Sequence, residues 1–288
     1  MQAEVVLNYG RANCSTVEVR RNPIVIDAHC HLMATARWPY QGGADKLSAK
    51  PLVDKMNASG VDVGISMGSG GNTLEWLRAS NDFNLQASKD FPGRIVPMIY
   101  FDPRYEEDGI EEIDRCMQKG GFKGIKVGHE GAEARYMLPM MEKAQHYGIP
   151  VSIHSDHSVR SHPYLIADLA NSFPKVTVVC LHMGLRTAAA TELLGINAAE
   201  KNPNLWLETC FSHPYPIRMA VKRLGADRIM YGSDSSNDGF ASGDGHERPE
   251  YEMMIQMDMV RCLNLPKEQE DKIMGLNAAR LYGVVVKK

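Results

Sequence analysis

Histidine and aspartate side chains recur at the ends of short apolar runs in this chain of 288 residues. Imidazole nitrogens and carboxylate oxygens form the mixed ligand sets that borderline divalent ions prefer. If these side chains converge in the fold, they predict a site for one divalent metal ion, Zn²⁺ first, with Mn²⁺, Fe²⁺ and Co²⁺ as alternatives. The residues concerned are His29 and His31 in IVIDAHCH, His154 after VSI, His182 after VTVVCL and Asp234 after RIMYGS.

The first of these runs reads as a β-strand whose polar residues share one side. Side chains of a strand alternate between two faces, so His29 and His31 should point the same way. We expect this polar side to face the interior of the fold, with the two histidines at the carboxyl end. By the same alternation Val25 and Asp27 belong to the polar side, and Ile24, Ile26 and Ala28 to the other.

The elements that must position these residues repeat along the chain. An amphipathic run ends at Gly or Pro, and a β-branched apolar run follows at once, because Gly stops a helix in the left-handed conformation and Pro cannot continue one. Strands alternating with helices give a parallel sheet. Eight such units predict an α/β fold, a single-domain (β/α)8 TIM barrel, with a doubly wound open sheet as the alternative. The predicted strands are 24–29, 61–68, 94–101, 122–128, 149–155, 175–182, 204–210 and 228–234.

Two parts of the chain lie outside this repeat. Residues 1–23 form a predicted N-terminal extension, and residues 24–288 form the barrel domain with C-terminal helices. The segments 249–263 and 267–283 are helical in pattern and are expected to follow the last repeat unit. Because the carboxyl ends of barrel strands carry active sites, the repeat would bring the histidines and Asp234 to one mouth.

Composition excludes several classes of partner. With 32 Lys and Arg against 35 Asp and Glu the net charge is -3, which argues against nucleic acid or an anionic membrane. No apolar stretch approaches the ~18 residues of a membrane span, and the N-terminus has no signal-peptide pattern. The six cysteines form no C-x-x-C pair, so free thiols and a cytoplasmic location are expected.

Six motifs, in this order, resemble the amidohydrolase superfamily of metal-dependent hydrolases, in the branch that includes aminocarboxymuconate semialdehyde decarboxylase. The resemblance implies that His29, His31, His154 and Asp234 ligate the metal and that His182 lies close by and assists the chemistry. It covers nearly the whole chain after residue 23. The motifs are IDAHCHL at 26–32, GFKGIKV at 121–127, VSIHS at 151–155, VCLHMG at 179–184, YGSDSS at 231–236 and GLNAARLYG at 275–283.

The expected function is metal-dependent hydrolysis of a C–O or C–N bond in a small carboxylated molecule, such as a lactone or cyclic amide. A bound metal lowers the pKa of its water toward ~7, Asp234 can accept and return the proton, and His182 can polarise a substrate oxygen. The alternative is a lyase, a metal-dependent decarboxylase or hydratase of an unsaturated carboxylic acid. A metal-binding scaffold without catalysis is the third hypothesis.

Four further residues are candidate substrate contacts. Lys126, at the end of a predicted strand, either bridges a second metal when carboxylated, as in some superfamily members, or contacts substrate. Arg37 and Arg186 could clamp a substrate carboxylate, and His157 follows His154 closely enough to line the same pocket. Solvated side chains remain the alternative for these three. The sequence leaves open whether the chain forms a homodimer.

Overall fold

The computed structural model describes residues 5–8, 16–19, 23–32, 48–69, 73–128, 134–185, 189–237 and 251–286. Within these ranges the strands of the predicted repeat are present and run parallel to one another. They are β3 (Ile26–His31), β4 (Val63–Ser66), β5 (Ile95–Pro97), β6 (Ile99–Phe101), β7 (Ile125–Val127), β8 (Val151–Ile153), β9 (Val178–Cys180), β10 (Leu205–Glu208), β11 (Ile229–Met230) and β12 (Ser235–Ser236).

These strands close into a barrel. One sheet has the order β12-β3-β4-β5 and the other runs β11-β10-β9-β8-β7-β6. Backbone hydrogen bonds continue across both junctions between the two sheets. At the junction of β5 and β6, Met98 donates to the Ser66 carbonyl of β4 (2.8 Å). At the junction of β3 and β11, Ala28 donates to the Tyr231 carbonyl (2.9 Å). This confirms the predicted (β/α)8 barrel.

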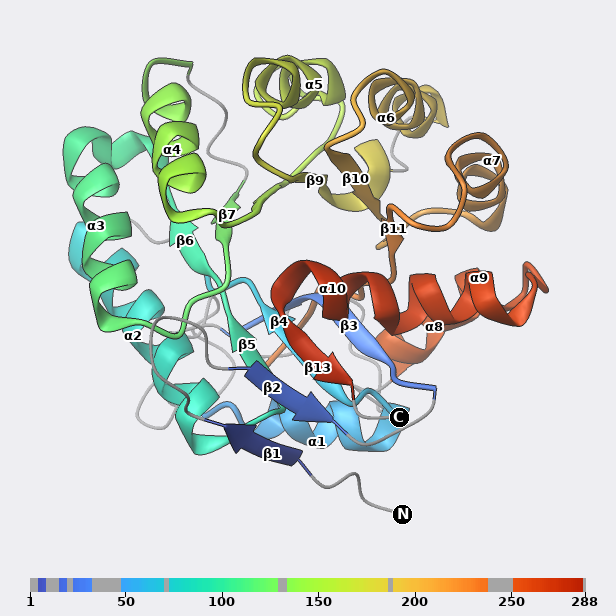
Figure 1. The fold of residues 1–288 in the computed structure, drawn as a ribbon, viewed down its shortest axis with the longest axis horizontal. Coiled ribbons are helices and arrows are strands. Elements are labelled where there is room, and N and C mark those ends of the chain that lie inside the picture. Colours follow the sequence, from blue (N-terminus) through green and yellow to red (C-terminus); the bar gives the residue numbers. More distant parts are fainter. Residues whose placement is uncertain are drawn as a thin grey trace, which may run out of the picture.

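Helices surround the strands on the outside (Figure 1). Their ends follow local chemistry: α1 stops at Gly60 with φ of 81°, and the Thr73 side chain caps α2 by accepting from the Trp76 amide (3.2 Å). The helices are α1 (Lys50–Ser59), α2 (Leu74–Asp90), α3 (Glu106–Lys119), α4 (Ala134–Tyr147), α5 (Pro163–Ser172), α6 (Ala189–Lys201), α7 (Pro214–Leu224) and α8 (Tyr251–Arg261), with 3-10 turns at Pro103–Tyr105 and Leu181–Gly184.

The position of α8 corrects one expectation. The sequence pattern placed residues 249–263 outside the repeat, yet α8 packs against both α7 and α1 and therefore completes the ring. Its apolar side holds Met253, Met257 and Val260 in the core, and the Tyr231 hydroxyl donates to the Met253 carbonyl (3.1 Å). The helix thus belongs to the eighth repeat unit.

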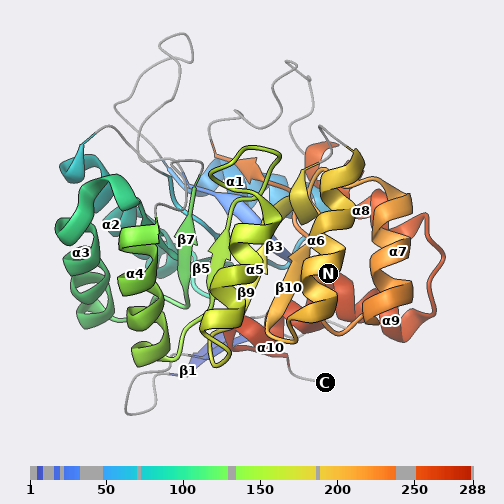
Figure 2. The same ribbon diagram turned by 90° about the horizontal axis from the view of Figure 1, so that it is seen from above.

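The chain then crosses the amino-terminal end of the barrel. After α9 (Lys267–Asp271) and a π-helical turn (Lys272–Leu276), α10 (Asn277–Tyr282) contacts β3 and β11, and its Tyr282 hydroxyl lies 3.1 Å from that of Ser152. Figure 2 shows α10 and β1 at this end of the strands. There β13 (Val284–Val286) pairs with β2 (Thr16–Val19), which pairs with β1 (Val5–Asn8).

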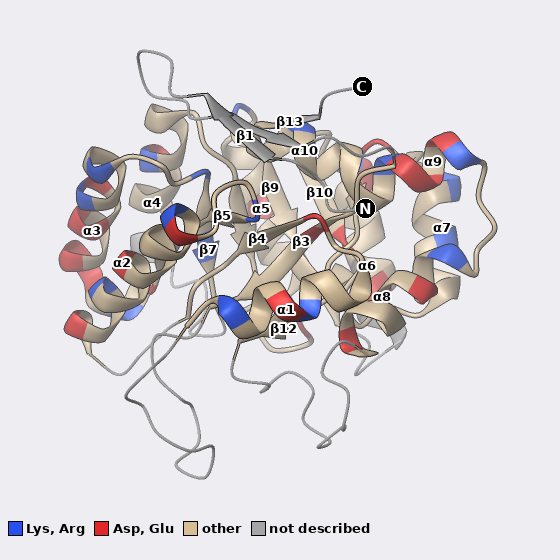
Figure 3. Ribbon diagram, turned by 90° about the horizontal axis from the view of Figure 1, so that it is seen from below, with Lys and Arg blue, Asp and Glu red and all other residues tan. Residues whose placement is uncertain are grey.

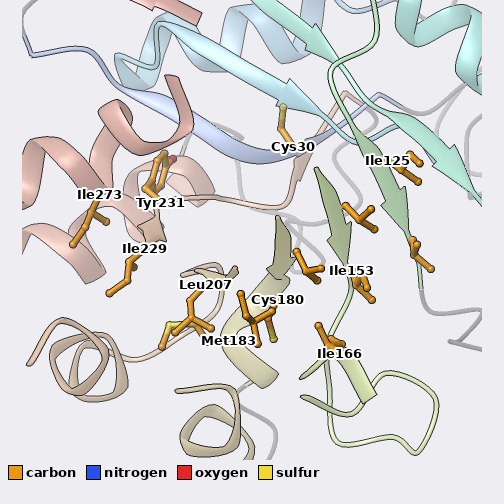
Figure 4. Close-up of a cluster of buried hydrophobic side chains, with 14 of the residues drawn as sticks. Cys30, Ile125, Ile153, Ile166, Cys180, Met183, Leu207, Ile229, Tyr231 and Ile273 are labelled. Carbon is orange, nitrogen blue, oxygen red and sulfur yellow. The ribbon is translucent and has the colours of Figure 1, made fainter. Parts of the chain in front are cut away.

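Two apolar layers hold the barrel. The inner cluster joins side chains from opposite walls, such as Ile65 of β4 and Val179 of β9, with Ala278 of α10. The outer cluster lies between strands and helices. Figure 4 shows part of it, with Ile153, Cys180 and Leu207 on neighbouring strands, Ile166 on α5 and Ile273 in the π-helical turn.

A β-bulge in β3 corrects the simple alternation expected for this strand. Asp27 pairs with Gly64 and Cys30 pairs with Ser66, so β3 has one more residue than β4 between the two pairs. Before the bulge, Ile26 and Ala28 join the inner cluster and Val25 joins the outer one, so the expectation that Val25 and Asp27 face the interior is wrong. The bulge then reverses the alternation, and Cys30 joins the outer cluster. Asp27 lies in register with the outward Gly64. Beyond the bulge, His29 and His31 both reach the site described below.

Charges of both signs are interspersed over the described helices, as Figure 3 shows for α2, α3 and α9. Among the described residues, no helix is long and apolar enough to cross a bilayer. The described cysteines are free thiols: Cys30, Cys116, Cys180 and Cys210 are buried and Cys262 is exposed.

Replacing Gly195 of α6 by Ala should lower stability by ~1–3 kcal/mol through overpacking. A Cβ there would lie 2.3 Å from the Met183 carbonyl oxygen, which is backbone and cannot rotate away. Chemical denaturation would measure the loss. Leu193→Ala, at a position of α6 where the side chain is 37% exposed, is the control and should cost less. Equal or higher stability of the Gly195 variant would contradict the close approach of α6 to the Leu181–Gly184 turn.

Candidate metal centre

Three side chains from β3 and the turn after β11 converge at the carboxyl end of the barrel. The Nε2 atoms of His29 and His31 lie 3.1 Å apart. Asp234 Oδ1 lies 3.2 Å from His29 Nε2 and 2.9 Å from His31 Nε2. The His29 side chain is fully buried, whereas the side chains of His31 and Asp234 are 12% and 23% exposed. The cluster is therefore enclosed on one side and open on the other.

Neighbouring groups orient both imidazoles. His31 Nδ1 lies 2.6 Å from the carbonyl oxygen of Gly68, which can only accept, so Nδ1 donates and neutral His31 has its lone pair on Nε2. His29 Nδ1 lies 3.0 Å from Glu208 Oε2, an oxygen that also accepts from the His182 amide (3.1 Å). Such outer carboxylates and carbonyls orient histidine ligands in metal sites.

The donor set fits a divalent metal ion. Ligand bonds of ~2.1 Å place neighbouring ligand atoms roughly 3.0–3.4 Å apart, and the three atoms are separated by 2.9–3.2 Å. Two lone pairs and a carboxylate at such distances repel one another unless positive charge lies between them. His29, His31 and Asp234 are therefore the residues that could hold the ion.

Burial and neighbouring groups set the charges of the cluster. Burial holds the pKa of His29 well below its usual value, so this imidazole is neutral near pH 7. Burial alone would raise the pKa of Asp234, but His29, His31 and His182 together hold it well below its usual value. A neutral imidazole and an ionised carboxylate are the forms that bind metal ions.

His182 and His154 continue the cluster as a row of imidazole rings. The His182 ring centroid lies 4.9 Å from that of His29 and 4.8 Å from that of His154, and Phe211 stacks on His182 at 5.7 Å. The structure thus brings His154 to the same mouth, but beside His182. His154 Nε2 faces Asp156 Oδ2 at 3.3 Å, which turns this nitrogen toward the carboxylate.

Left-handed backbone conformations aim two of these side chains. Asp234 has φ of 60° and His182 has φ of 61°, values that are uncommon outside Gly. The Asp234 amide donates to the His29 carbonyl (2.6 Å), and the Ser233 amide and hydroxyl both donate to Asp27. These bonds hold the turn against its strain, as is typical of functional sites.

Of the four predicted substrate contacts, the two that the structure describes are not part of the cluster of His29, His31 and Asp234. Lys126 is buried in β7 and lies near enough to His29 to lower the pKa of that imidazole. His157 is exposed in the loop after β8. Arg37 and Arg186 lie outside the described residues, so their roles stay predictions.

Sequence reasoning missed Glu208, Asp156 and Cys210. Glu208 is fully buried at the end of β10, and a carboxylate at the carboxyl end of a predicted strand was the signal that could have found it. Burial raises its pKa to about 8, and a cation bound to His29 would favour the ionised form. Cys210 offers an alternative donor group, since it lies with His29 and His182 within 4.8 Å.

Two buried ionisable side chains lie behind the Asp234 turn. Lys55 of α1 donates from Nζ to the Ser236 carbonyl (2.6 Å), which ties β12 to the helix. Burial raises the pKa of Glu252 on α8 to about 7, although Ser235 and Lys55 partly lower it. The turn that carries Asp234 therefore rests on ionisable groups from α1 and α8.

Glu208→Gln should weaken the binding of Zn²⁺ by ~10–100-fold, the usual effect of losing an outer carboxylate. Gln keeps the shape but loses the negative charge that favours a donating Nδ1 on His29. Competition with a chromophoric chelator would measure the affinity. Glu112→Gln, also buried but on α3, is the matched control. Wild-type affinity in the Glu208 variant would contradict its role in orienting His29.

Glu252→Gln should make stability less dependent on pH. Because the pKa is raised in the folded state, the folded chain keeps a proton that the unfolded chain loses, so stability falls as pH rises from about 4.5 to about 7. The variant avoids this loss and at pH 8 should gain up to about 3 kcal/mol over wild type.

Chemical denaturation of the metal-free proteins at pH 4.5, 6 and 8 would measure this difference. Glu111→Gln, on an exposed part of α3, is the control and should follow the wild type. A gap between the Glu252 variant and wild type that does not change with pH would overturn the assignment.

Comparison with known proteins agrees with this architecture. A family model described as amidohydrolase matches residues 26–284. No curated protein sequence is similar enough to match the chain. Three of the similar solved structures, each at most 17% identical, show the same fold.

The first is a 5-carboxyvanillate decarboxylase from Novosphingobium aromaticivorans with bound manganese and a methoxy-hydroxy-nitrobenzoic acid (15% identity, 91% of this chain and 97% of that chain, TM-score 0.65). The second is a 4-oxalomesaconate hydratase from Rhodopseudomonas palustris (17%, 90% and 95%, 0.61). The third is a probable 2-pyrone-4,6-dicarboxylic acid hydrolase from Acinetobacter baumannii with citric acid bound (12%, 90% and 99%, 0.61). Since the family model spans nearly all of the barrel, the chain belongs to the amidohydrolase family.

Proposed function

We propose that this enzyme hydrolyses a C–O or C–N bond of a small carboxylated molecule, such as a lactone or cyclic amide, with one divalent metal ion. The observation that carries the proposal is the approach of His29 Nε2, His31 Nε2 and Asp234 Oδ1 to within 3.2 Å of one another. We propose His154 as a further ligand and Zn²⁺ as the first choice of ion. Free buried thiols support a cytoplasmic location.

The bound ion would supply Lewis acidity and lower the pKa of water, so that hydroxide is available near neutral pH. Asp234, ionised and partly exposed, can take the proton from the attacking water and return it to the leaving group. His182 can hold the substrate oxygen on which negative charge develops. Its position is fixed by Glu208 at the backbone amide and by Phe211 stacked on the ring.

A carboxylated substrate is supported by the similar structures named above, which bind or act on carboxylic acids. In this chain the proposed contacts are the buried Lys126, the exposed His157, and Arg37 and Arg186, which lie outside the described residues. Lys126 lies in the barrel wall, where an ammonium can meet a substrate carboxylate.

The second candidate is a lyase, a metal-dependent decarboxylase or hydratase of an unsaturated carboxylic acid. It is favoured by the decarboxylase and hydratase among the similar structures. The same residues would serve, with Asp234 moving a proton to or from a substrate carbon.

Turnover in H2¹⁸O separates these reactions. Zn²⁺- or Mn²⁺-loaded enzyme would be incubated with lactones, cyclic amides, hydroxybenzoates and unsaturated acids, and products analysed by mass spectrometry. Hydrolysis of a lactone or cyclic amide places ¹⁸O in the new carboxylate, hydration places it in a new hydroxyl, and decarboxylation releases CO2 and leaves the organic product unlabelled. Products of the last two kinds alone would replace the hydrolase proposal with the lyase.

Asp234→Asn and His182→Asn should each lower kcat by ~10²–10⁴-fold, the usual range for lost acid–base catalysis, while metal remains bound. The Asn side chain keeps an oxygen donor but cannot carry the proton. Elemental analysis and kinetics on the identified substrate would measure both effects, with Asp258→Asn on the exposed part of α8 as the control. Near-normal turnover in both variants would remove these residues from the mechanism.

A further inference from the structure

The turn that follows β10 holds His182 at its backbone and at its ring. The His182 amide donates to Glu208 Oε2 (3.1 Å), and the His182 carbonyl accepts from the Ser212 hydroxyl (3.3 Å). The Phe211 ring stacks on the imidazole, with the ring centroids 5.7 Å apart and the ring planes inclined by 7°. Such values are typical of an offset-stacked aromatic pair. The position of His182 therefore depends on the conformation of residues 208–212.

Phe211 has a backbone conformation that a phenylalanine rarely adopts. The Ser212 amide donates to the Thr209 carbonyl (3.0 Å), which closes a β-turn with Cys210 and Phe211 at its centre. Phe211 has φ of 58°, whereas Cys210 is not among the residues with positive φ. This combination is that of a type II turn, whose third residue is usually Gly. The Phe211 side chain adds strain to the turn, so its contribution lies in the contact of its ring with His182.

Gln256 of α8 holds the strained turn from outside. Its side chain is buried, on the side of the helix that also buries Met253 and Met257. Gln256 Oε1 accepts from the Phe211 amide (2.9 Å). Because a backbone amide can only donate, the oxygen of the Gln256 side chain faces it, and not the NH2 group.

The orientation of one peptide group decides the type of this turn. The N–H that Gln256 binds belongs to the central peptide of the turn, between Cys210 and Phe211. A flip of the central peptide converts a type II turn into a type I turn, in which the third residue has negative φ and no strain. Gln256 therefore selects the orientation in which Phe211 keeps its positive φ.

We propose that Gln256 is a positioning residue, which holds the His182 ring in place through Phe211. The inference rests on the proposed function, since the position of this ring affects turnover only if His182 contacts the substrate oxygen. Without the acceptor on Gln256, strain favours the flip of the central peptide, and the Phe211 ring leaves the imidazole. The helix that completes the ring thus also acts on the mouth of the barrel.

A double-mutant cycle on turnover gives the first test. Gln256→Met keeps the length of the side chain but removes the acceptor, and Phe211→Ala removes the ring. Each should lower kcat by ~10–100-fold with KM little changed, since a misplacement of about 1 Å can cost ~100-fold and His182 acts on charge that develops during the reaction. The double variant should be no slower than Phe211→Ala alone, because Gln256 acts through Phe211.

Two further variants are the controls for the cycle. Phe211→Tyr keeps the ring and should keep the turnover. Gln145→Met, at an exposed position of α4, makes the same replacement away from the mouth and should behave as wild type. If the effects of Gln256→Met and Phe211→Ala multiply in the double variant, Gln256 acts independently of Phe211 and the proposal is wrong.

Proton NMR of protein labelled with ¹³C-histidine gives the second test, which needs no substrate. A ring stacked on the imidazole shifts the carbon-bound ring protons of His182 upfield, and the His182→Asn variant identifies these signals. They should move downfield in both Phe211→Ala and Gln256→Met, and stay in place in Phe211→Tyr. Unchanged His182 signals in Gln256→Met would overturn the role of Gln256. If the signals move as expected but wild type converts no substrate of the proposed classes, the proposed function fails and the positioning of His182 stands.

Discussion

Two imidazole nitrogens and a carboxylate oxygen share a space in which each lies within 3.2 Å of the others. All three are electron-rich, and His29 is withdrawn from water, so their repulsion is only weakly screened. Positive charge between them turns this repulsion into attraction, which is why a divalent cation is the occupant that the geometry favours. The chemistry we propose for Asp234 and His182 depends on this one constraint.

Several local features of the barrel hold these three atoms close together, and these features lower the stability of the fold. The bulge in β3 interrupts the ladder so that His29 and His31 reach the mouth together, and the left-handed turns at His182 and Asp234 are strained. Glu208 is a buried carboxyl that contacts His29 and the His182 amide at once. The close-packed barrel, with α10 across its far end, can hold such local strain.

Much of this arrangement follows from sequence pattern. Gly and Pro stops before β-branched runs predicted the barrel, because they act locally and recur in each unit. Strand direction predicted that His29, His31 and Asp234 would lie at the same end of the barrel, where His154 and His182 also lie. The bulge was not predictable, since the consecutive residues Ala28 and His29 face the same side of β3 only through the pairing of this strand with β4.

Contacts between elements far apart in the sequence could not be predicted from the sequence pattern either. Nothing in the local sequence of Glu208 indicates that it would meet His29, which lies 179 positions away. The place of α8 in the ring depended on packing between α7 and α1, which a helical pattern does not encode. Substrate contacts are the least predictable, because the conformation of βα loops is not set by local periodicity.

Anomalous diffraction at the zinc edge from crystals grown with Zn²⁺ tests the central claim most directly. The account predicts one strong peak within bonding distance, about 2.0–2.2 Å, of His29 Nε2, His31 Nε2 and Asp234 Oδ1. A peak bonded to Cys210 Sγ with His29 and His182, or no peak at the barrel mouth in a protein saturated with zinc, would contradict it.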